Sequence, residues 1–205
     1  MSQPRWAVVV PVKPLSRAKS RLRQDVPGVC LDRLALAFAL DTVAAALASD
    51  PVAEVLVVTD DDVAAEASLA LGARVAPDRP RRGLNPAVRY GASLLTGRPV
   101  AALAGDLPAL RPAELAAALD AATALGRRCF VPDAPGSGTV LLAAPAGVDL
   151  DPRFGAGSAR AHEASGAAPL AGDWPTLRRD VDTAADLASA SRLGLGPRAT
   201  ALLDR

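Results

Sequence analysis

Residues 6–12, WAVVVPV, form a continuous apolar run that is rich in β-branched valine. Such a run predicts a short strand buried on both faces of a sheet. Comparable runs follow at 54–60 (EVLVVTD), 73–77 (ARVAP) and 99–105 (PVAALAG), and the segments between them carry apolar residues at helical spacing. Strands that alternate with helices favour an α/β fold, in which helices on both faces cover a mostly parallel, Rossmann-like sheet.

The rest of the chain extends this pattern. Two further strands, at 127–133 and 139–145, flank the glycine turn GSG with no helix between them, which predicts an antiparallel extension of the sheet. The remaining predicted elements are helices at 31–48, 61–71, 86–95, 112–125 and 183–193, a glycine turn entering a short helix at 155–166, and a last strand at 176–182. Asn85 is the expected N-cap of the third helix, with Pro86 at its first position. The 205 residues show no internal repeat or linker, so we predict a single domain over residues 1–205.

Composition excludes several classes of partner. The formal net charge of +1 gives no electrostatic basis for binding DNA, RNA or an anionic membrane. No apolar run reaches the length of a membrane-spanning helix or of a signal-peptide core. Cys30 and Cys129 lie far apart without metal-type spacing and are expected to be reduced thiols, as in the cytoplasm.

Three aspartates stand at predicted strand ends or within the last strand. Asp180 and Asp182 are two residues apart in LRRDVDTAADL, so an extended backbone would point both carboxylates to one side. Asp106 follows the strand at 99–105. Carboxylates gathered in this way suit Mg²⁺ and metal-dependent nucleotidyl transfer. The alternative for each acid is that it caps the following helix.

The loop after the first strand, PVKPLSRAKSRL at 11–22, is basic. In open α/β sheets ligands bind at the carboxyl ends of strands, so Lys13, Lys19 and Arg21 are candidates to neutralise a triphosphate. A solvated surface loop is the alternative. The glycine turns at 136–139 and 154–158 are candidate anion sites, with a plain hairpin turn and a helix cap as their alternatives.

Several common signatures are absent. No phosphate-binding P-loop precedes Lys19, and GAGSAR lacks the third glycine of a dinucleotide fingerprint. The single histidine, His162, has no second histidine with which to form a zinc helix. A nucleophile elbow is also missing, which argues against a serine hydrolase.

Together these motifs resemble one family over nearly the whole chain. The segments PVKPLSRAKSRL, GLN at 83–85, GDLP, PDAPGSGT at 132–139, FGAGS with His162, and DVDTAADL occur in the order seen in the guanylyltransferases of coenzyme F420 biosynthesis. These enzymes are nucleotidyltransferases of the sugar-nucleotide type. They join GTP to a phosphorylated three-carbon acid and release pyrophosphate.

The resemblance implies a role for each motif. Asp106, Asp180 and Asp182 would hold Mg²⁺, and Lys13, Lys19 and Arg21 would lie in the loop that contacts the GTP phosphates and supports catalysis. Thr139, Gly155 and Ser158 would contact the acid substrate, and the segment from Gly83 to Asn85 would lie near the guanine. The bacterial branch of the family uses phosphoenolpyruvate, and the Ala- and Arg-rich composition favours that branch.

Other possibilities remain at this stage. The same chemistry on 2-phospho-L-lactate or 3-phosphoglycerate is one, and a related nucleotidyltransferase with another acceptor is a second. A nucleotide-binding domain without turnover and a purely structural α/β protein are the others. Ala134 and Pro135 stand where family members often carry a basic residue, and Pro86 is unusual, which puts fine substrate contacts in question. The family also implies delivery of the product to the next transferase of the pathway, and the apolar surplus leaves room for a homodimer.

Overall fold

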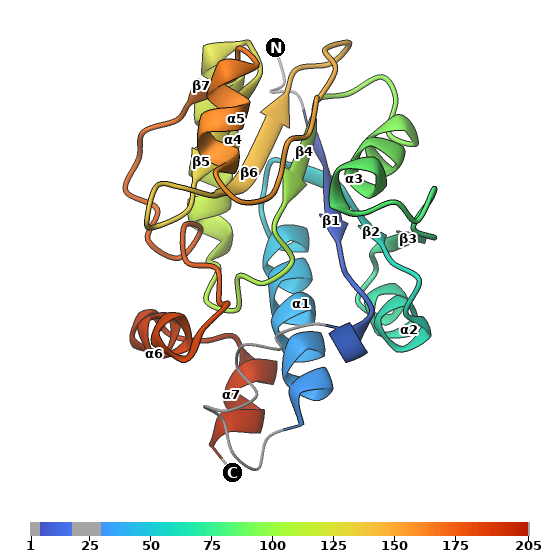
Figure 1. Cartoon of the computed structure of the whole chain (residues 1–205), viewed down its shortest axis with the longest axis vertical. Coiled ribbons are helices and arrows are strands. Elements are labelled where there is room, and N and C mark those ends of the chain that lie inside the picture. The colour runs from blue at the N-terminus through green and yellow to red at the C-terminus, as the bar shows by residue number, and fades with distance from the viewer. Residues whose placement is uncertain (1–4, 18–29, 205) are drawn as a thin grey trace.

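The computed structural model describes residues 5–17 and 30–204. Its centre is a seven-stranded sheet with the order β3-β2-β1-β4-β6-β5-β7 (Figure 1). The strands are β1 (Trp6–Pro11), β2 (Val52–Val58), β3 (Arg74–Ala76), β4 (Val100–Leu103), β5 (Cys129–Pro132), β6 (Thr139–Ala144) and β7 (Ala168–Pro169). The pairs β1/β2, β1/β4, β2/β3 and β5/β7 are parallel, and β6 runs antiparallel to both β4 and β5. The predicted α/β class with an antiparallel extension is therefore confirmed.

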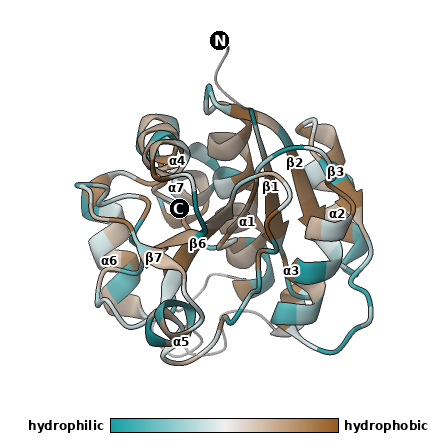
Figure 2. Ribbon diagram, turned by 90° about the horizontal axis from the view of Figure 1, so that it is seen from above, coloured by the Kyte–Doolittle hydropathy of each residue, from teal (hydrophilic) through white to brown (hydrophobic). Residues whose placement is uncertain are grey.

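Helices cover both faces of this sheet. They are α1 (Leu31–Leu47), α2 (Asp62–Ala70), α3 (Leu84–Ser93), α4 (Pro112–Leu125), α5 (Ser158–Ala164), α6 (Ala184–Leu193) and α7 (Pro197–Leu203), with a 3-10 turn, η1, at Leu15–Arg17. Seen from above, α4 and α5 lie on opposite sides of the apolar strands (Figure 2). In the described part of the chain, no helix combines the length and the apolar character needed to cross a membrane.

The alternation of side chains along β1 divides the core between the two faces. Val8 and Val10 join a cluster that includes Val43 of α1 and Leu119 of α4. Ala7 and Val9 point to the other face, where they pack with Ala87 of α3 and with residues of β2. Because every residue from Trp6 to Val10 is buried, the strand requires a continuous apolar run rather than an alternating one.

Three local predictions are wrong. Residues 176–182 form a turn followed by irregular backbone, not a strand, because single bonds such as Val181 N–H to the Asp106 carbonyl (3.1 Å) replace a ladder. The third helix starts at Leu84 with Gly83, not Asn85, as its N-cap. Pro86 therefore stands at the third helical position, not the first as predicted. It is tolerated there because its missing N–H would have no partner within the helix. β7 and α7 were not predicted, because each is too short to show a periodic pattern.

Candidate active site

A cavity of about 670 Å³ opens at one edge of the sheet, where several strands end. β1 and β4 are parallel, so Lys13 after β1 and Asp106 after β4 reach the same edge. β6 is antiparallel, and its first residue, Thr139, therefore lies there too. The segments that follow β1 and β4 approach closely at this point. A Cβ on Gly105 would stand 3.0 Å from the Pro11 carbonyl oxygen, so glycine at this position allows the close approach.

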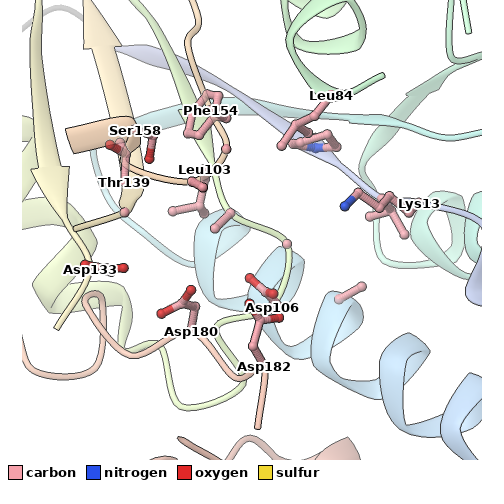
Figure 3. Close-up of a pocket in the computed structure, with 18 of the residues that line it drawn as sticks. Lys13, Leu84, Leu103, Asp106, Asp133, Thr139, Phe154, Ser158, Asp180 and Asp182 are labelled. Carbon is pink, nitrogen blue, oxygen red and sulfur yellow. The ribbon is translucent and has the colours of Figure 1, made fainter. Parts of the chain in front are cut away.

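Asp106, Asp180 and Asp182 all line this cavity, as the sequence predicted (Figure 3). The hydrogen bond from Val181 N–H to the Asp106 carbonyl joins the two segments that carry them. Val181 is fully buried, and the aspartates on either side of it turn to the cavity. The predicted alternation therefore holds although the predicted strand does not form.

The structure contradicts the alternative that these acids are the N-caps of the following helices. The N-cap of α4 is Arg111, and the N-cap of α6 is Thr183. Thr183 forms a capping box with Asp186, in which each side chain accepts a hydrogen bond from the other's backbone N–H.

Electrostatics in the cavity disfavour several negative charges without a counter-ion. Burial, and then repulsion from the carboxylates of Asp106, Asp133 and Asp182, together raise the pKa of Asp180 to about 7. Within residues 5–17 and 30–204, no three His, Cys, Asp or Glu side chains are arranged to hold a metal ion by themselves. Mg²⁺ commonly takes only one or two carboxylates and completes its shell with water and substrate phosphates, and these acids fit that mode of binding.

Hydroxyl groups and glycines form the opposite part of the cavity. Thr139 and Ser158 are buried and lie together in Figure 3, away from Asp106 and Asp182. A hydrogen bond of 3.1 Å from Ala159 N–H to the Ser137 carbonyl joins the two predicted glycine turns. Gly155, which also lines the cavity, has a φ of 136°, a conformation that side chains rarely adopt. The structure thus brings Thr139, Gly155 and Ser158 into one site.

The structure describes some of the residues that were predicted to bind the nucleotide, but not all of them. Lys13 is exposed and lines the cavity, whereas Lys19 and Arg21 lie outside the described residues. Leu84, between Gly83 and Asn85, also lines it. The Asn85 amide pairs with the Phe154 backbone, donating to its carbonyl (3.0 Å) and accepting from its N–H (2.7 Å). Asn85 thereby fixes the loop that precedes Gly155.

Two residues at the site lie in the motifs quoted from the sequence but were given no role there. Asp133 lines the cavity, accepts a hydrogen bond from Ser137 N–H (2.8 Å), and leaves no room for a Cβ on Gly138. His162 is fully buried behind Thr139, and its Nδ1 lies 2.9 Å from the Thr139 hydroxyl oxygen. The sequence signal for Asp133 was its place before the glycine turn. For His162 it was its place after the FGAGS segment and the fact that it is the only histidine of the chain.

Comparison with known proteins identifies the class. The family model described as the MobA-like NTP transferase domain matches residues 33–153. A candidate nucleotide-diphospho-sugar transferase from Desulfovibrio desulfuricans G20 shares the fold, with a TM-score of 0.68, 17% identity, and coverage of 100% of this chain and 95% of that chain. The chain is a nucleotidyltransferase with the fold of the nucleotide-diphospho-sugar transferases.

Curated relatives define the family more narrowly. Phosphoenolpyruvate guanylyltransferase of Salinispora arenicola is 64% identical over 97% of this chain and 92% of its own length. The protein of the same name from Geodermatophilus obscurus is 59% identical over 97% of this chain and 94% of its own. The chain belongs to the phosphoenolpyruvate guanylyltransferase family, and the resemblance inferred from its motifs is confirmed.

Proposed function

We propose that this protein transfers the guanylyl group of GTP to the phosphate of phosphoenolpyruvate. The observation that carries the proposal is the division of one cavity into two parts in a chain of this family. Acids suited to a nucleotide-bound cation line one part, and hydroxyl and glycine donors suited to a small anion line the other. The products would be enolpyruvoyl-2-diphospho-5'-guanosine and pyrophosphate.

The reaction needs no protein nucleophile. A phosphate oxygen of phosphoenolpyruvate attacks the α-phosphorus of GTP, a new P–O bond forms there, and the bond to the β-phosphate oxygen breaks as pyrophosphate leaves. A phosphate oxyanion carries no proton that must be removed, so the protein has to align the two substrates and offset their charge. Lys13, which is exposed and lines the cavity, would offset charge on the triphosphate.

Each group of residues has a role in this proposal. Asp106, Asp180 and Asp182 would hold Mg²⁺, which when bound supplies positive charge and orients the phosphates. Thr139, Gly155 and Ser158 would bind the phosphate and carboxylate of the acid. The remaining candidates are nucleotide contacts: Lys19 and Arg21 on the triphosphate, and Gly83 and Asn85 near the guanine.

The wider assignment follows from the family. We place the reaction in coenzyme F420 biosynthesis in the cytoplasm, with the product passed to the next transferase of the pathway. A homodimer is part of this proposal, and 2-phospho-L-lactate and 3-phosphoglycerate are the alternative acceptors. The three acids differ by a few atoms that would meet Thr139, Gly155 and Ser158.

The test is pyrophosphate release from GTP and Mg²⁺ with each of the three acids in turn, with mass detection of the guanylylated product. Product with phosphoenolpyruvate at the highest kcat/KM supports the proposal. Preference for another acid would correct the acceptor, and GTP binding without product from any acid would overturn the function. Replacement of Mg²⁺ by EDTA in the same assay should abolish product.

A further inference from the structure

His162 of α5 is a buried imidazole without contact to solvent. Its side chain is 0% exposed, between the rings of Phe130 (centroids 5.8 Å apart) and Phe154 (5.2 Å, edge to face). Burial lowers the pKa of His162 to about 4, although the Asp151 carboxylate opposes the shift. The imidazole is therefore neutral at physiological pH, and one ring nitrogen carries the only proton.

The hydrogen bonds of the ring decide which nitrogen that is. Nε2 lies 2.9 Å from the backbone nitrogen of Arg153. A backbone N–H can only donate, so Nε2 must be the acceptor and the proton must be on Nδ1. Nδ1 lies 2.9 Å from the Thr139 hydroxyl oxygen and therefore donates to it.

This direction of donation determines what the Thr139 hydroxyl can do. Since its oxygen accepts from His162, its own proton must turn to another acceptor. Within the described part of the chain, no second partner of this hydroxyl is present, and Thr139 lines the cavity. We propose that His162 is a positioning residue that holds the Thr139 hydroxyl proton toward the cavity, ready to donate to an anionic oxygen of the acid substrate.

The inference rests on the proposed function for the identity of the anion, but its structural part can be tested separately. Because His162 is the only histidine, ¹⁵N-histidine labelling gives one pair of ring-nitrogen signals. We expect the wild-type protein at pH 7 to show a protonated Nδ1 and an unprotonated Nε2. A protonated Nε2, or a charged ring, would overturn the inference whether or not the protein turns over phosphoenolpyruvate.

Kinetics test the effect on the substrate. His162→Gln keeps an acceptor near the Nε2 position and removes the Nδ1 donor, whereas His162→Asn keeps a donor near Nδ1. Hydrogen bonds to charged groups have energies that correspond to roughly tenfold or more in affinity, so His162→Gln should raise the KM for phosphoenolpyruvate about tenfold and leave the KM for GTP unchanged. The His162→Asn variant should be closer to wild type.

A double-mutant cycle separates positioning from general damage. In Thr139→Val protein no hydroxyl remains to be oriented, so adding His162→Gln should change the KM for phosphoenolpyruvate little further. An equal rise of that KM in both backgrounds would overturn the inference, as would equal changes in the KM values of both substrates. Wild-type protein without turnover on phosphoenolpyruvate would refute the proposed function instead, and the nitrogen spectrum would still decide the role of His162.

Discussion

Acidification should destabilise this protein through His162. The ring is neutral and buried in the native state, with a pKa of about 4, whereas a histidine in the unfolded chain titrates near ~6.5. Below pH ~6.5 the unfolded state binds a proton that the native state does not, so stability falls as the pH decreases toward ~4. Above pH ~6.5 this contribution is constant. A difference of about 2.5 pKa units corresponds to a loss of about 3 kcal/mol between pH 8 and pH 4.

The assay is urea unfolding at a series of pH values, with wild-type and His162→Gln proteins compared at each. Carboxylates elsewhere titrate in both proteins, so the difference between the two curves isolates His162. The wild-type protein should lose about 3 kcal/mol more than the variant from pH 8 to pH 4. Parallel curves for the two proteins would refute the reasoning, because they would mean that the native ring takes up its proton as easily as the unfolded one.

Further predictions concern the cavity and α7. Asp182→Asn should abolish nucleotidyl transfer and leave the unfolding transition in EDTA nearly unchanged, because Asp182 is exposed at the cavity and outside the core. Ser158→Ala should raise the KM for phosphoenolpyruvate about tenfold and that for GTP much less, since a hydroxyl donor to a charged group is lost. Asp41→Ala should cost about 3 kcal/mol of unfolding free energy without changing either KM, because the buried Asp41 carboxylate accepts hydrogen bonds from Arg198 N–H (3.2 Å) and Ala199 N–H (2.9 Å) at the start of α7.

Matched variants control these experiments. Ser189→Ala on α6, outside the cavity, should leave both KM values at the wild-type level. A rise in the KM for GTP larger than that for phosphoenolpyruvate in Ser158→Ala would place the acid elsewhere. If the Asp182→Asn protein keeps most of the wild-type rate, this residue is not part of the metal site. Unchanged stability of the Asp41→Ala protein would show that α7 does not depend on its hydrogen bonds to Asp41.

The sequence predicted the sheet well because burial on both faces leaves a local signal. The runs around Val8, Val57 and Ala102 are apolar throughout, as strands between two helical layers must be. Asp180 and Asp182 were found for a similar reason. Side chains two residues apart point to the same side of any extended backbone, whether or not that backbone belongs to a sheet. Whether that backbone pairs with a neighbour depends on the distant Asp106 loop, and a local pattern cannot show it.

Interactions between distant segments account for what was missed. Asn85 has the residue type and position of a helix cap, yet its amide binds Phe154, 69 residues away. The N–H groups at the start of α7 donate to Asp41, which lies 158 residues before Ala199. The role of His162 depends on Thr139 and Arg153 at once, and no spacing rule connects these three residues.

Guanylyl transfer to phosphoenolpyruvate is tested most directly by the fate of a phosphorus label in GTP. The enzyme is incubated with phosphoenolpyruvate, Mg²⁺ and GTP labelled either at the α- or at the γ-phosphorus, and the products are separated. Label from the α position should appear in the guanylylated acid, and label from the γ position only in pyrophosphate. Label from the γ position in the acid product, or none from the α position, would contradict nucleotidyl transfer to this acceptor.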